Sequence, residues 1–93
     1  MEGLTEGRIV HYVLTRADAK EINLKRTCNE VGEGMHFPMI VVRVWSETGN
    51  VNGQVFLDGL NTLWVQSVNP DPTPGELKPN VRKSGTWHWI ERA

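Results

Sequence analysis

The chain has 93 residues, with 10 Lys and Arg against 11 Asp and Glu and a hydrophobic fraction of 39%. This length fits one domain spanning residues 1–93, and the composition is that of an ordinary folded protein rather than a disordered one. The formal net charge of −1 supplies no overall field for DNA or an anionic membrane, so neither generic DNA binding nor membrane association is expected. The single cysteine, Cys28, and an acidic N-terminus without an apolar run predict a complete protein of the reducing cytoplasm.

The first predicted elements are a strand and a capped helix. Residues 8–14 are β-branched and aromatic, which favours a strand. Thr15 precedes Asp18 by three positions, so its hydroxyl can accept from the Asp18 amide while the carboxylate favours the positive end of a helix. These residues predict a helix over residues 16–26. Residues 28–37, with two glycines and no apolar periodicity, predict a loop.

The middle of the chain predicts three consecutive strands. Residues 39–45 have almost no polar interruption and are expected to form the central strand, covered on both faces, with Pro38 limiting where pairing begins. Turn residues at 46–50 and 58–61 separate this strand from strands predicted at 51–57 and 62–68. The three strands should form an antiparallel meander.

The C-terminal third predicts a loop and a closing strand. Residues 69–84 contain four prolines and should loop over the surface. Residues 85–91 alternate polar and aromatic side chains, which predicts a strand with Trp87 and Trp89 on one face. The whole is therefore an α+β, β-rich domain: a small bent antiparallel sheet or SH3-like barrel of about five strands with one helix near the N-terminus. Its exposed edges predict at least a dimer.

Residues suited to catalysis or metal binding form no recognisable pattern. The three histidines, His11, His36 and His88, fall on a strand, a loop and a strand without the spacing of metal ligands, which predicts separate imidazoles and no metal site. No serine or cysteine lies next to a local base. We therefore expect neither an enzyme nor a cofactor.

Cationic residues are clearer candidates for an anionic ligand. Arg43 interrupts an apolar strand, which costs free energy unless it meets a ligand or forms a salt bridge to Glu47 or Asp58. Arg82 and Lys83 precede the closing strand and either bind an anion or are simply solvated. Combined with an aromatic such as Phe56, these cations offer charge for a phosphate and a flat surface for a base.

The turn at residues 58–61 has two interpretations. It follows an apolar strand and presents the Asn61 amide, which can read a base edge with a donor and an acceptor together. Equally, it is an ordinary hairpin turn in which Asp58 is chosen for backbone hydrogen bonding.

Several segments together resemble a known group of phage proteins: residues 37–45, residues 51–59 with 63–68, and Gly85-Thr86-Trp87-His88-Trp89. They are similar to small phage and prophage proteins, and among characterised ones to the first-discovered family of anti-Thoeris sponge proteins. Members sequester glycocyclic ADP-ribose signals made by host TIR enzymes without degrading them, and hexameric members also hold cyclic trinucleotides. The resemblance implies a dimer or hexamer in the cytoplasm of the infected bacterial host.

The resemblance also implies a ligand pocket at a subunit interface. It would be lined by an aromatic residue on the returning strand, an Asn in the following turn and an Arg near the aromatic C-terminal segment. The matching positions are Phe56, Asn61 and Arg82, with Asn52 and Lys83 as substitutes.

A second class of function remains open. A small phage inhibitor could bind a host protein directly through an aromatic surface, and a pair of exposed tryptophans at Trp87 and Trp89 would serve that purpose. A third possibility is a small virion component.

Overall fold

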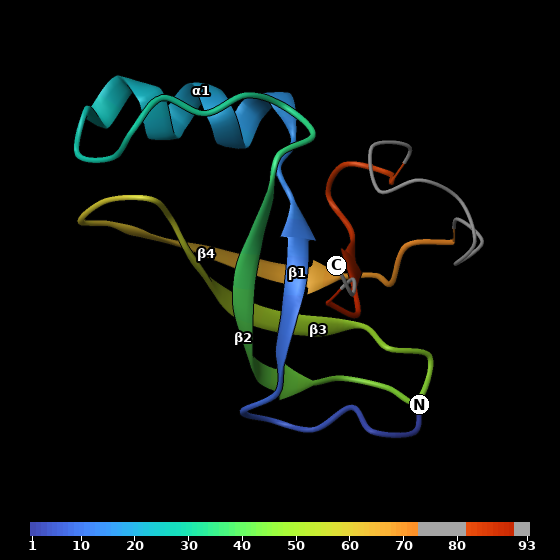
Figure 1. Cartoon of the computed structure of the whole chain (residues 1–93). Helices are drawn as coiled ribbons and strands as arrows, with labels where there is room; N and C mark the ends of the chain where they lie inside the picture. Colours follow the sequence, from blue (N-terminus) through green and yellow to red (C-terminus); the bar gives the residue numbers. More distant parts are fainter. Residues whose placement is uncertain (73–81, 91–93) are drawn as a thin grey trace.

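The computed structural model describes residues 1–72 and 82–90 and contains one helix and one five-stranded antiparallel sheet (Figure 1). The strands lie in the order β4-β3-β2-β1-β5. The predicted central position of β2 and the α+β, β-rich class are confirmed, and the sheet is bent and open rather than a closed barrel. The elements are β1 (Ile9–Val13), α1 (Arg16–Lys25), β2 (His36–Val44), β3 (Val51–Phe56), β4 (Thr62–Val68) and β5 (Trp87–His88).

The capping box predicted for the helix is present. The Asp18 amide donates to Thr15 Oγ1 at 3.0 Å, and the Thr15 amide donates to Asp18 Oδ2 at 3.0 Å. The Tyr12 hydroxyl also donates to Asp18 Oδ2, at 2.6 Å. Burial raises the pKa of Tyr12, and this hydrogen bond raises it further. The end of β1 and the start of α1 are thus tied to one carboxylate, and Arg26, with φ of 54°, ends the helix.

We expect Thr15→Ala to lower the free energy of unfolding by about 1 kcal/mol, because the Asp18 amide loses its capping acceptor. Urea unfolding followed by circular dichroism measures the change. Thr5→Ala is the matched control, since Thr5 is exposed and lies outside the helix, and it should change stability by less than about 0.5 kcal/mol. Equal stabilities for the two variants would contradict the capping role.

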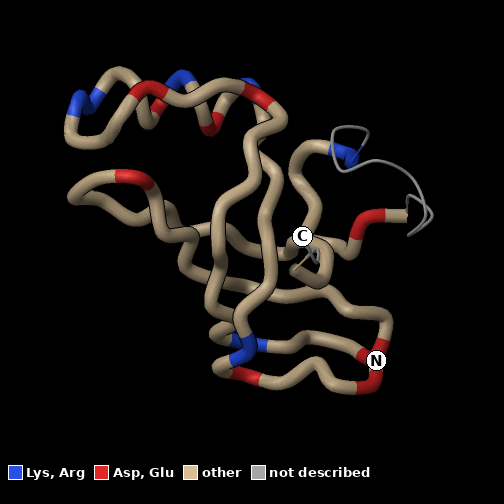
Figure 2. The backbone as a smooth tube through the Cα atoms, in the orientation of Figure 1, with Lys and Arg blue, Asp and Glu red and all other residues tan. Residues whose placement is uncertain are grey.

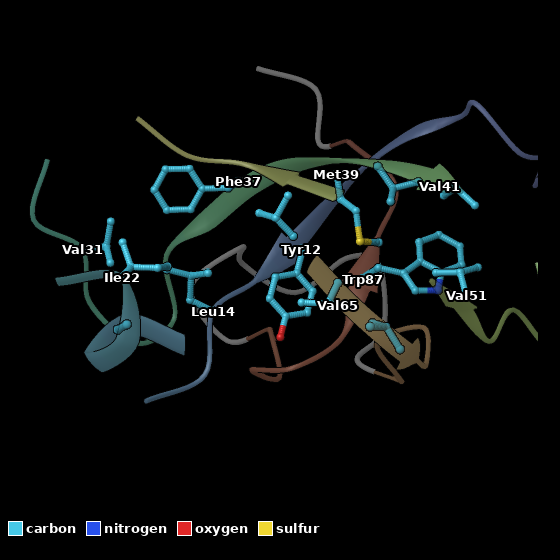
Figure 3. Close-up of a cluster of buried hydrophobic side chains, with 14 of the residues drawn as sticks. Tyr12, Leu14, Ile22, Val31, Phe37, Met39, Val41, Val51, Val65 and Trp87 are labelled. Atoms are coloured by element: carbon cyan, nitrogen blue, oxygen red, sulfur yellow. The ribbon is translucent and has the colours of Figure 1, made fainter. Parts of the chain in front are cut away.

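The two faces of the sheet differ sharply. One face carries the core shown in Figure 3, and α1, which lies at one end of the sheet in Figure 1, contributes Ala19 and Ile22 to it. The opposite face, called the outer face below, exposes large apolar side chains. The prediction that β2 is covered on both faces is therefore wrong, because buried residues of β2 alternate with exposed ones such as Pro38 and Val42. The fully buried residues of the core include Val10, Leu14, Met39, Val41, Val51, Val55 and Trp87.

The start of β2 also differs from expectation. The strand begins at His36, so Pro38 lies inside it, opposite His11 on β1. The pairing of β2 with β3 begins only at Met39, opposite Val55. Pro38 is tolerated because it lies beyond that pairing, so β3 has no backbone hydrogen bond that an N–H at this position would have to donate.

The closing strand, β5, is shorter than predicted, and it pairs with β1 on one side and with the segment after β4 on the other. It comprises Trp87 and His88. The Trp87 amide donates to the Asn69 carbonyl at 3.1 Å, and the Asp71 amide donates to the Trp87 carbonyl at 2.8 Å. The start of the predicted loop is thus fastened to β5, and residues 73–81 and 91–93 lie outside the described residues. No helix in the described ranges has the length and apolar character needed to cross a membrane.

Candidate functional site

The two C-terminal tryptophans have different roles. Trp87 is 1% exposed and its indole Nε1 donates to the Gly49 carbonyl at 2.7 Å, whereas Trp89 is 39% exposed. Their rings meet edge to face with centroids 5.2 Å apart. The prediction of an exposed tryptophan pair is therefore wrong for Trp87, which belongs to the core and packs against the Trp89 ring.

Trp89 is shared by two open hollows of the surface, which we call the Trp89 site. One, of about 350 Å³, is also lined by Asp71, Arg82 and Trp87. The other, of about 540 Å³, is also lined by Arg8 and by Ile9 and Ile90. Both volumes fall within the range of small-molecule sites, about 300–1,000 Å³.

Arg8 gives the Trp89 site an exposed positive charge. Its guanidinium carbon lies 5.4 Å from the centroid of the Trp89 ring, a cation–π distance. Figure 2 shows basic and acidic positions interspersed along the backbone. Arg8 therefore acts as a local charge beside an aromatic ring.

Arg82 lies in the same site but is already paired. Its Nη1 is 3.3 Å from Asp71 Oδ2, and the Asp71 side chain is fully buried while that of Arg82 is 11% exposed. A phosphate bound at Arg82 would therefore have to share its guanidinium with Asp71. Lys83, its predicted substitute, is exposed and lies next to it in the chain.

Phe56 and Asn61 lie outside the Trp89 site. Phe56 ends β3 and is 44% exposed on the outer face. Asn61 lines a different, smaller pocket between α1 and the connection from β3 to β4. The turn before Asn61 is held to the segment that follows α1: the Asn29 amide donates to the Asp58 carbonyl at 2.9 Å. This contact gives the turn a structural role that requires no ligand.

Asn52 and Arg43 both contact Trp45, so neither side chain needs a ligand to explain its position. The Asn52 Oδ1 accepts from Trp45 Nε1 at 2.9 Å and from the Ser67 amide at 2.8 Å, and Asn52 is 9% exposed. The Arg43 guanidinium lies 4.1 Å from the Trp45 ring centroid. Arg43 is exposed, so it bears no burial cost and needs neither of the salt bridges considered above.

The three histidines converge, contrary to the prediction of separate imidazoles. The rings of His11, His36 and His88 contact one another edge to face, with centroids 4.8 to 6.3 Å apart. One nitrogen from each ring lies within 4.8 Å of the others. Sequence spacing missed this cluster because β1, β2 and β5 become neighbours only in the folded sheet.

Comparisons with protein-family models, with curated proteins and with solved structures found no match to this chain. The fold and the site define a small α+β domain in which an exposed tryptophan after β5 lines one hollow with Arg8 and another with Arg82. The sequence indicated Trp89 and Arg82 but not Arg8 or Asp71. Arg8 meets Trp89 from the opposite end of the chain, and Asp71 meets Arg82 across the predicted loop.

Proposed function

We propose that this protein binds a small nucleotide signal of the glycocyclic ADP-ribose class and sequesters it without cleaving it. One observation carries the proposal: Trp89 is exposed between hollows that contain Arg8 and Arg82. A tryptophan ring can stack on adenine, and arginines can pair with a pyrophosphate. The resemblance to anti-Thoeris sponge proteins supports the choice of signal.

The proposal includes self-association as a dimer or hexamer. The outer face exposes Val42, Phe56 and Trp64 at 44–47%, and apolar exposure of this kind is common where another chain binds. Phe56 and Asn61 would then contribute to a pocket with the Trp89 site of a second copy. Light scattering of the purified protein tests this part of the proposal, and a monomer at micromolar concentration would remove it.

The ligand is tested by capture and by calorimetry. Protein purified from cells that make TIR-derived signals, then denatured, should release an intact glycocyclic ADP-ribose that mass spectrometry identifies. Calorimetry should give heat with that molecule and none with linear ADP-ribose.

Trp89→Ala and Arg8→Ala should each weaken binding about tenfold or more, because a base stack contributes about 1–3 kcal/mol and a hydrogen bond to a charged group about 1.5–3 kcal/mol.

Arg43→Ala is the matched control for Arg8→Ala. Both are exposed arginines over a tryptophan ring, at 4.1 Å and 5.4 Å from its centroid, and Arg43 does not line the Trp89 site. Its removal should leave the affinity unchanged. If Arg43→Ala weakens binding and Arg8→Ala does not, the site lies at Trp45. If calorimetry gives no heat with any glycocyclic ADP-ribose or cyclic trinucleotide and a host protein co-purifies, the sponge proposal is wrong. The protein is then better explained as a protein-interaction module.

A further inference from the structure

The histidine cluster gathers every histidine of the chain at one place. The sequence contains three histidines, and His11, His36 and His88 come from β1, β2 and β5, segments far apart along the chain. Nothing in sheet formation requires histidine at these positions. The convergence of all three therefore calls for a chemical reason rather than a packing one.

The register of the sheet explains why the rings meet. His11 lies directly opposite His88, and His36 lies opposite Val13, two positions from His11 along β1. Side chains two apart on a strand, and side chains directly opposite each other across strands, share a face. The three imidazoles thus stand on the outer face, and three hydrogen-bonded strands hold their backbones.

The burial of the cluster suits a metal site better than a solvated surface. His88 is 6% exposed, while His11 and His36 are half-buried. A tetrahedral zinc ion with Zn–N bonds of about 2.0–2.1 Å needs nitrogens about 3.3 Å apart. The nitrogens lie within 4.8 Å of one another, so the imidazole rings would have to rotate closer together to share one ion.

We propose that His11, His36 and His88 bind one divalent transition-metal ion of the zinc, cobalt or nickel type through three imidazole nitrogens. Imidazole is a preferred ligand of these ions. Three histidine ligands leave a fourth tetrahedral position for water or another oxygen donor. The proposal is independent of nucleotide binding, and its test uses metal ions alone.

The test uses the untagged full-length chain after treatment with a chelator. Zn²⁺ calorimetry should give one ion per chain, and Co²⁺ should produce the visible absorption of a tetrahedral complex. His11→Ala and His36→Ala should each lower Zn²⁺ affinity at least about a hundredfold, since loss of groups that merely orient ligands already costs about 10–100-fold. The two half-buried histidines are replaced first because His88 is buried, and circular dichroism checks that each variant is folded.

Cys28→Ser is the matched control, because the sole thiol of the chain is the other strong zinc ligand and lies outside the cluster. It should bind Zn²⁺ as the wild type does. Imidazole NMR adds a readout specific to the cluster: all three histidine signals should shift together and stop shifting at one equivalent. Zn²⁺ affinity unchanged in His36→Ala, affinity lost in Cys28→Ser, or a shift of one imidazole alone at large excess would each overturn the proposal.

Discussion

Trp87→Ala is expected to lower the free energy of unfolding by about 3–5 kcal/mol, as deletion of a buried aromatic side chain does. Trp87 is 1% exposed, and its indole donates to the Gly49 carbonyl, which the substitution leaves without that donor. A domain of this size has a total stability of roughly 5–14 kcal/mol. The substitution therefore removes a large part of the free energy of unfolding, and Trp89 loses the ring against which it packs.

Urea unfolding followed by circular dichroism measures this effect. Trp64→Ala is the control, because Trp64 is 46% exposed and its loss should cost less than about 1 kcal/mol. Trp87→Phe keeps an aromatic ring but removes the Nε1 donor and the second ring of the indole, so it should cost less than Trp87→Ala, about 1–3 kcal/mol. If Trp87→Ala is as stable as Trp64→Ala, Trp87 is not the centre of this part of the core.

Arg82→Ala is expected to be nearly as damaging, at about 3–5 kcal/mol, because it takes one partner from a buried ion pair. The Asp71 side chain is fully buried and lies 3.3 Å from the Arg82 guanidinium. Lys83→Ala is the matched control: Lys83 is the adjacent cation, it is exposed, and its loss should stay within about 0.5 kcal/mol.

A double-mutant cycle separates structure from ligand binding at this position. Asp71→Asn combined with Arg82→Ala should recover part of the lost stability, because the buried carboxylate is then absent. The variant that regains stability also allows the Arg82 contribution to ligand affinity to be measured in a folded protein. Additive losses in the double variant would contradict the coupling of Asp71 and Arg82.

Local signals predicted most of the secondary structure correctly. Thr15 and Asp18 start the helix through contacts three residues apart, and the turn residues at 46–50 and 58–61 separate β2, β3 and β4 as expected. Such features depend on hydrogen bonds and steric preferences within a few residues, so the sequence alone contains the information. The apolar run at 39–45 likewise indicated a central strand.

The burial of each strand face could not be predicted in the same way. An apolar run shows that a strand can be covered on both sides, but it does not show whether the rest of the chain supplies a cover. In the described residues, one face carries the core, to which α1 contributes Ala19 and Ile22, and the outer face keeps Val42 and Phe56 exposed. The alternation of Trp87 and Trp89 likewise did not show which of the two lies in the core.

The sequence by itself determined a small α+β domain, its helix cap, its meander and the residue types available to bind an anion. Only the tertiary structure decided which of those residues meet: Arg8 with Trp89, Asp71 with Arg82, and His11 with His36 and His88. For the histidines, and for Arg8 with Trp89, the physical reason is that strand order and register join segments that are distant along the chain. A binding site depends on those long-range contacts, whereas a cap or a turn depends on its immediate neighbours.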